Sequence, residues 1–149
     1  MLQSLTYVSK ASDLMSPDKL RQLLIESQES NSLHDITGVL LYIEGKFLNT
    51  IEGRFIQVLE GTTDDVKLTF EKIKIDFRHM HVNVLDDTLI KKRYFKNWSM
   101  GFKAISLEDF EKTTGYFELD NLEVLKSNPK SFNVPMMYLK SFYNMRQNA

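Results

Sequence analysis

This chain of 149 residues contains three histidines, which are few for a metal enzyme. His79 and His81 are the only histidine pair, and on a strand both would face the same side, which would suit a metal ion. No third ligand is evident, and the sequence contains no cysteine. We therefore expect no metal site, no disulfide and no cysteine nucleophile.

Phosphate-binding and hydrolytic motifs are missing from the sequence as well. It contains neither G-x-x-x-x-G-K-[ST] nor G-x-G-x-x-G, and no serine lies in G-x-S-x-G. Lysine plus arginine is 19 and aspartate plus glutamate is 20, so the net charge of −1 disfavours general nucleic-acid binding. With 42% hydrophobic residues, no apolar run of roughly 20 residues and no signal peptide, we expect a globular cytoplasmic protein without membrane contact.

Asn31 is a polar side chain whose position requires a partner. Ser16-Pro17-Asp18 predicts the start of a helix, with a serine cap, proline at the first position and an acid near the positive end. The buried stripe of this helix has a spacing of three to four residues and consists of Leu20, Leu23, Leu24, Ser27 and Asn31. An asparagine at the end of the stripe is consistent with a C-cap or with contact to a ligand, and both interpretations remain open.

A short tandem repeat lies in the β-rich segment 35–61, which predicts a hairpin. The blocks EGKFLNTI (44–51) and EGRFIQVL (52–59) share their Glu, Gly and Phe, and the other positions match in character. A third EG follows at 60–61. Because eight is even, an insertion of this length in a regular strand preserves which side chains face the core.

Strands and helices around the hairpin define the order of elements. Strands are predicted at 2–9, within 35–61, and at 80–88 and 93–102. A second helix is predicted from Thr62 or Thr63, with the apolar stripe Val66, Phe70, Ile73 and Phe77. From Ser106 onward, including LEDFEKTTGYF, the pattern is helical again, and it ends in an amphipathic helix from about Val134 to Asn144. The order β-α-β-β-α-β-β predicts an α+β, ferredoxin-like sheet with two helices on one face and the C-terminal helices on the other.

Five short patterns, taken together and in this order, resemble the BLUF family of flavin-binding blue-light sensors. They are Tyr7 in LTYVS, Asn31 five residues before ITG (36–38), FIQVLEG (55–61), DFRH (76–79) and NWSMGF (97–102). The resemblance implies a BLUF flavin-binding domain at 1–102 and a C-terminal helical extension at 103–149 that packs on the sheet. It also implies that the bound cofactor is FAD, with FMN or riboflavin as alternatives.

The resemblance further implies roles for single residues. Tyr7 matches the photoactive tyrosine that donates an electron and then a proton to the excited flavin, and Gln57 matches the switching glutamine between them. Asn31 matches the asparagine that hydrogen-bonds the polar edge of the ring. Trp98 and Met100 match an output pair on the fifth strand. Positions that contact the flavin in related domains correspond to Ser27, Ile36, Lys72, Ile73 and Asp76.

The repeat makes the position of the switching glutamine ambiguous. Counting forward from Ile36, Asn49 occupies the usual distance, whereas counting backward from DFRH and NWSM, Gln57 does. We assign the role to Gln57 because QVLEG surrounds it and NTIEG surrounds Asn49. The inserted residues are then expected to lengthen the tip or loop of the hairpin.

A photoreceptor module, not an enzyme, is the function that these residues indicate. The 47 residues after Phe102 are too few for an output enzyme domain, so we expect signalling through self-association or a separate effector protein. The alternative is a ferredoxin-like interaction module that keeps the fold but binds no flavin. A flavin oxidoreductase is less well supported, because no nicotinamide motif is present.

Overall fold

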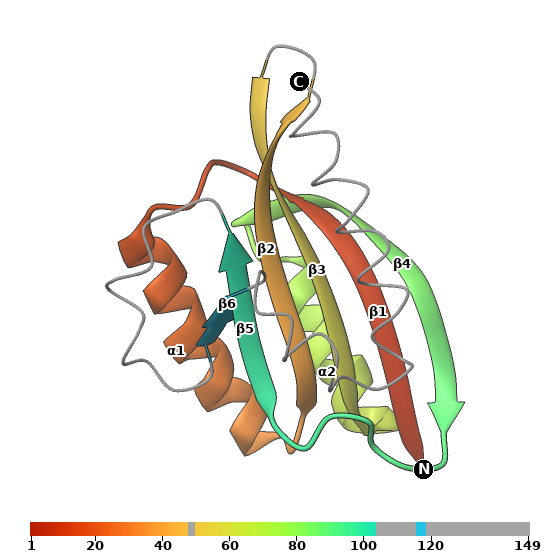
Figure 1. Ribbon diagram of the computed structural model, residues 1–149. Helices are drawn as coiled ribbons and strands as arrows, with labels where there is room; N and C mark the ends of the chain where they lie inside the picture. Colours follow the sequence, from red (N-terminus) through yellow and green to blue (C-terminus); the bar gives the residue numbers. More distant parts are fainter. Residues whose placement is uncertain (48–49, 104–115, 119–149) are drawn as a thin grey trace.

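The computed structural model describes residues 1–47, 50–103 and 116–118, which form one sheet and two helices (Figure 1). The strands are β1 (Leu2–Ala11), β2 (Thr37–Phe47), β3 (Thr50–Thr62), β4 (His79–Ile90), β5 (Trp98–Lys103) and β6 (Tyr116–Glu118). The helices are α1 (Pro17–Leu33) and α2 (Thr63–Lys74). The strand order is β4-β1-β3-β2-β5-β6, in which β1, β3, β2 and β4 pair antiparallel while β5 joins β2 in parallel. The α+β, ferredoxin-like prediction is confirmed.

Both helices lie on the same face of the sheet (Figure 1). Leucines of α1 pack on Leu40, Phe55 and Met100 of the sheet, and Val66 and Phe70 of α2 pack on strands β1 and β3. The opposite face carries a second set of buried apolar side chains, namely Val8, Val39, Leu41, Ile56 and Val58. The C-terminal helices expected on that face fall within 103–149, of which the structure describes only Lys103 and 116–118.

Local capping chemistry fixes where the two helices begin. Ser16 Oγ accepts a hydrogen bond from Lys19 N at 3.2 Å, and Thr62 Oγ1 accepts one from Asp65 N at 3.2 Å. Asn31 lies inside α1 and not at its end, because the C-cap is His34, so the C-cap interpretation is wrong. The predicted stripe of α2 is wrong at its last residue, since the helix ends at Lys74 and the following turn leaves Phe77 88% exposed.

The repeat lengthens the β2–β3 hairpin without disturbing its pairing. The register runs unbroken from Thr37 opposite Glu60 to Phe47 opposite Thr50, and the two strands extend past their neighbours (Figure 1). This confirms the expected longer hairpin. Gly53, at the base of the extension, has no room for a side chain, because a Cβ there would lie 2.5 Å from the hydroxyl oxygen of Tyr42.

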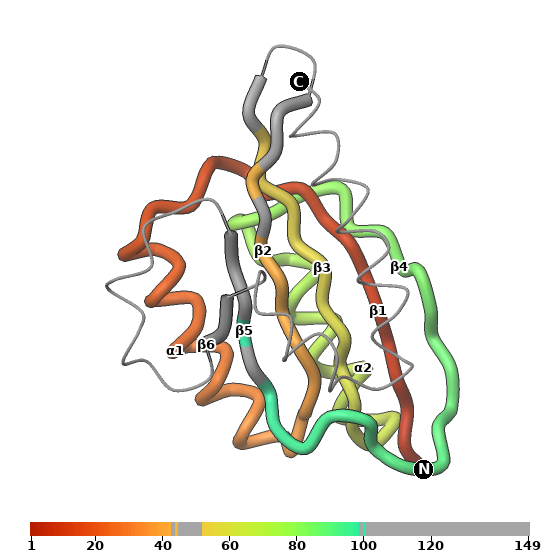
Figure 2. The backbone as a smooth tube through the Cα atoms, in the orientation of Figure 1, coloured from red at the N-terminus to blue at the C-terminus, as the bar shows by residue number. Residues whose placement is uncertain are grey.

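Two predicted boundaries near the end of the described chain are wrong. The strand expected from residue 93 begins only at Trp98, because the backbone N–H groups of Tyr94 and Phe95 bond to the Glu60 side chain and not to a neighbouring strand. The connection from β4 to β5 instead crosses the end of β3 and β2 (Figure 2). Residues 116–117, placed in a helical segment by the sequence pattern, form part of β6, which pairs with β5.

Candidate functional site

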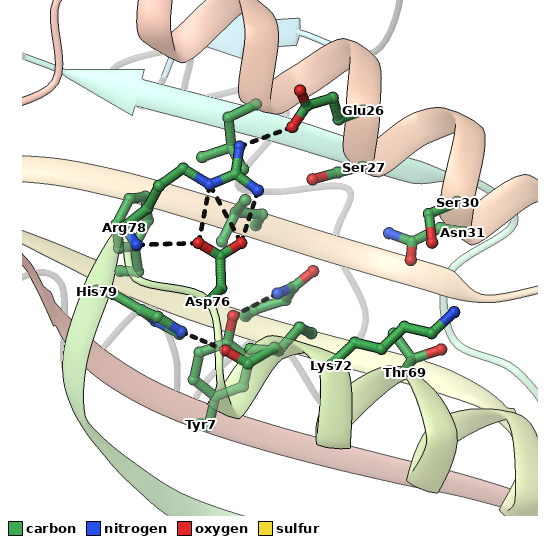
Figure 3. A pocket seen from close by; sticks show the side chains of 15 residues that line it. Tyr7, Glu26, Ser27, Ser30, Asn31, Thr69, Lys72, Asp76, Arg78 and His79 are labelled. Atoms are coloured by element: carbon green, nitrogen blue, oxygen red, sulfur yellow. Dashed lines mark hydrogen bonds and ion pairs between the residues drawn. The ribbon is translucent and has the colours of Figure 1, made fainter.

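A cavity of about 230 Å³ lies between the two helices and the sheet (Figure 3). Its apolar surface comes from Leu23 of α1, Ile73 of α2 and Leu40 and Phe55 of the sheet. Its polar surface comes from Tyr7, Gln57, Ser27, Ser30, Asn31, Thr69 and Lys72, with Glu26, Asp76, Arg78 and His79. An apolar slot with polar groups at its edges suits a planar ring that carries hydrogen-bonding atoms on its rim.

Tyr7, Gln57 and Trp98 form a continuous hydrogen-bonded chain in the core. Tyr7 and Gln57 are direct partners across the β1–β3 pair, and Gln57 Nε2 donates to Tyr7 Oη at 2.5 Å. Trp98 Nε1 donates to Gln57 Oε1 at 3.0 Å, and all three residues are buried. The amide of Gln57 is therefore held at both of its ends, by a phenol and by an indole.

Tyr7 is held as a neutral phenol by its surroundings. Burial raises its pKa above the ordinary value near 10, an effect that the hydrogen bond from Gln57 only partly offsets. The rings of Phe70 and His79 lie with their centroids 5.6 and 6.0 Å from that of Tyr7. A neutral phenol keeps both its electron and its proton available for transfer.

Several polar side chains on the helices face the cavity without a hydrogen bond to a described residue, and two of them, Thr69 and Asn31, belong to buried residues. Thr69 Oγ1 of α2 is buried and has no hydrogen bond, and the side-chain amide of Asn31 of α1 makes none to any described residue. A buried polar group left unpaired costs about 1–3 kcal/mol. These two groups are therefore suited to bind the polar edge of a ligand seated between the helices.

Arg78 closes one side of the cavity with an ion-pair network (Figure 3). Its Nη2 lies 2.6 Å from Asp76 Oδ2, and its Nη1 lies 2.9 Å from Glu26 Oε2. The guanidinium thus connects α1 with the turn that follows α2. Burial alone would raise the pKa of Asp76, but the hydrogen bonds and charge of Arg78 outweigh it and lower that pKa below its usual value.

This lowered pKa makes a contribution to stability that depends on pH. A carboxyl whose pKa is lower in the folded state stabilises the fold above its unfolded pKa, about 3.9, and loses that effect as pH falls through the folded value. We expect the free energy of unfolding to fall between pH 5 and pH 2.5, and to fall less steeply in Asp76→Asn. Urea unfolding across this range measures the slope. Asp13→Asn, which removes an exposed carboxylate that has no ion pair with any described residue, should keep the wild-type slope.

His79 is engaged on both sides of its ring. Its Nε2 donates to the carbonyl of Ile73 at 2.6 Å, and its Nδ1 lies 2.7 Å from Ser9 Oγ. The ring therefore ties the end of α2 to β1 and β4 beside Tyr7. The sequence pattern gave no contacts for His79 or Arg78, since both depend on residues far away along the chain.

Most predicted site residues reach the cavity, but three do not line it. Tyr7, Gln57, Asn31, Ser27, Lys72, Ile73 and Asp76 line it. Ile36 is instead packed in the core beneath α2, and Met100 is fully buried among the leucines of α1. Trp98 does not line the cavity, but its indole donates a hydrogen bond to Gln57, which does. The prediction missed Phe55, two residues before Gln57 on the same face, and Thr69, one helical turn before Ile73; these periodicities could have identified both.

A family model described as "Sensors of blue-light using FAD" matches residues 2–101. This chain belongs to the BLUF family. The β subunit of the photoactivated adenylate cyclase of Euglena longa is 33% identical over 100 residues, which are 66% of this chain and 11% of that protein. The BLUF protein BlrB in its dark state is 32% identical, with a TM-score of 0.57 over 68% of this chain and 70% of BlrB.

BLUF domains bind FAD, so the flavin predicted from the sequence is confirmed at the level of the family. Klebsiella pneumoniae BlrP1, solved with FMN, is 26% identical, with a TM-score of 0.67 over 94% of this chain and 35% of that chain. The cavity fits such a group, since its slot is apolar and Asn31 and Thr69 offer unpaired polar groups. The matched residues are a photosensor module and not a catalytic domain. Among the described residues, neither helix has the length and hydrophobicity of a transmembrane span.

Proposed function

We propose that this BLUF chain senses blue light through Tyr7 and Gln57, with a flavin held in the cavity between the helices. The flavin supplies the absorption of blue light and an excited ring that accepts one electron. The main support is the position of the Gln57 amide, which lines the cavity and bonds to Tyr7 at one end and Trp98 at the other.

In this proposal Tyr7 donates the electron, and the Gln57 amide changes its hydrogen bonds in response. On excitation Tyr7 gives one electron, followed by its phenolic proton, and recovers both when the charges recombine. While Tyr7 is oxidised and deprotonated, its oxygen no longer accepts the hydrogen bond from Gln57 Nε2 in the same way. The Gln57 amide then rotates or tautomerises. A glutamine suits this task because it carries an acceptor and a donor on one group, and exchanging them changes what it offers to each neighbour.

The output of the switch has to be nearly balanced between two states. One hydrogen bond is worth about 1 kcal/mol net, roughly a fivefold change in a population. Trp98 and Met100 lie on β5, and we propose that this strand passes the change to a helical extension at 103–149 that covers the opposite sheet face. The buried apolar side chains on that face, such as Val39 and Ile56, support a cover of this kind.

We further propose that the photoreceptor acts in the cytoplasm through self-association or a separate effector protein. A net charge of −1 gives nucleic acid and anionic lipid surfaces little to attract, which supports a protein partner. The Euglena relatives are adenylate cyclases of which this chain spans 11%, so their activity is not carried over.

Illumination of the purified protein tests the proposal directly. We expect a yellow protein whose absorbance shifts to the red under blue light and returns in the dark. A colourless protein that cannot be loaded with FAD would contradict the proposal and support a flavin-free interaction module instead.

We propose that Asn31, with Ser27, Lys72, Ile73 and Asp76, holds the flavin. Asn31→Ala removes an amide that is buried and otherwise unpaired, so we expect flavin to bind about tenfold more weakly, the effect of one good hydrogen bond. Titration of the flavin-depleted protein with FAD measures this. Asn83→Ala, on the exposed strand β4, is the control and should leave the affinity unchanged. Equal affinities in wild type and Asn31→Ala would place the ring elsewhere.

A further inference from the structure

Glu60 is a carboxylate buried completely within the fold, and the cavity makes no use of it. Its oxygens accept hydrogen bonds from the backbone N–H of Tyr94, at 2.9 and 3.1 Å, and from that of Phe95, at 2.8 Å. The carboxylate therefore binds the backbone of the connection between β4 and β5, and no cation of the described residues lies within hydrogen-bond distance of it. Burial raises the pKa of Glu60, because removing the ionised carboxylate from water costs free energy. The hydrogen bonds from Phe95 and Tyr94 and the charge of Arg93 offset this cost only in part.

Arg93 fastens the same connection from its other end. Its Nη1 donates to Thr37 Oγ1 at 2.8 Å and to the backbone carbonyl of Glu60 at 2.9 Å, and its Nη2 lies 3.1 Å from Asp35 Oδ2. Residues 93–95 are thus tied to the start of β2 and the end of β3.

This fastened segment leads directly into Trp98. Glu60 follows Gln57 by three residues on β3, so their side chains leave opposite faces of the strand. Gln57 holds the indole of Trp98 on the face toward the helices, while Glu60 holds the backbone of Tyr94 and Phe95 at the other face. The connection that carries residues 94 and 95 crosses the end of β3 before it enters β5 (Figure 2).

We propose that Glu60 is a positioning residue for the light switch: by holding the backbone of residues 94–95 it keeps the Trp98 indole on Gln57. The inference rests on the proposed function, because it assigns Glu60 a part in the rearrangement of Gln57. Trp98 restrains the amide of Gln57 through its Oε1. A looser connection weakens this restraint and therefore changes the barrier that the amide crosses on its return, and with it the life of the lit state.

Glu60→Gln in the full-length, flavin-loaded protein tests this assignment. The amide oxygen can still accept from the backbone N–H groups. Where the NH₂ group replaces Oε2, however, it faces the N–H of Tyr94, so at least that hydrogen bond to the connection is lost. Trp98 is the single tryptophan, so its indole N–H gives one NMR signal. We expect solvent exchange of that indole proton to rise at least fivefold in the dark and the rate of recovery after illumination to change by about fivefold.

Two comparisons separate positioning from general destabilisation. Glu52→Gln is the matched control, because it removes a second carboxylate of β3, which is only partly buried and pairs with Lys10 and Arg54 far from the connection; it should change neither readout. Trp98→Phe should change the recovery rate in the same direction as Glu60→Gln and about as much, and the double variant should differ from wild type no more than either single variant does, because both changes remove the same restraint.

Unchanged indole exchange and unchanged recovery in a folded Glu60→Gln protein would overturn the proposal, and so would full additivity with Trp98→Phe. Should Glu60→Gln fail to fold, Arg93→Lys replaces it and is expected to move both readouts in the same direction by a smaller factor. The indole exchange is measured in the dark. It therefore decides the role of Glu60 even if wild-type protein shows no red shift, a result that would contradict the proposed function alone.

Discussion

Gln57→Leu is expected to abolish the light-induced red shift while the protein still binds flavin. Leucine has nearly the volume of glutamine but neither a donor nor an acceptor, so the hydrogen bonds to Tyr7 and from Trp98 both disappear. Leaving the indole N–H unpaired costs about 1–3 kcal/mol of stability. The difference between absorbance spectra before and after illumination measures the effect, at equal flavin occupancy.

Asn49→Leu is the matched control for this experiment, because the repeat provides a second candidate for the switch. Asn49 occupies in the block 44–51 the position that Gln57 occupies in the block 52–59. Asn49→Leu should therefore show the full red shift. If Asn49→Leu abolished the shift and Gln57→Leu kept it, the switching amide would be Asn49.

Tyr7→Phe is expected to remove the light response as completely, for a different reason. The phenylalanine ring keeps the packing against Phe70, but it has no hydroxyl proton and is far harder to oxidise. It also removes the acceptor of the hydrogen bond from Gln57 Nε2, so the dark spectrum of the flavin should shift slightly. Steady illumination followed by absorbance measurement tests both expectations.

Tyr42→Phe provides the corresponding control, because Tyr42 is also a fully buried tyrosine on the helix face of the sheet. Its hydroxyl donates to Glu44 Oε2 at 2.8 Å and accepts from Met15 N at 3.0 Å, away from the cavity lining. Its loss should cost about 1–3 kcal/mol of unfolding free energy and leave the red shift intact. A red shift that persists in Tyr7→Phe would mean that the electron comes from another residue.

Features determined by neighbouring residues could be predicted from the sequence. Ser16 and Thr62 cap their helices through contacts three residues away, so a short motif reveals them. The alternation of strands likewise brought Tyr7 and Gln57 to one face of the sheet, because both follow a period of two.

Features determined by distant contacts could not be predicted in this way. Asparagine suits either a helix end or a buried ligand contact, and only the packing of α1 shows that Asn31 lies inside the helix. The start of β5 depends on Glu60, more than thirty residues earlier, which binds the N–H groups of residues 94 and 95. Trp98 and Met100 share one face of β5, so the sequence alone cannot distinguish which of them contacts Gln57.

The unbroken β2–β3 register has a consequence for how such a chain can lengthen. A hairpin gains one cross-strand residue pair for every two residues added. Eight added residues therefore make four further pairs and do not require a longer connecting turn. An odd number cannot be shared equally between two strands and would force a bulge or a wider reversal. We therefore expect insertions of two residues, or of multiples of two, at this place to keep Gln57 paired with Tyr7 and Leu40.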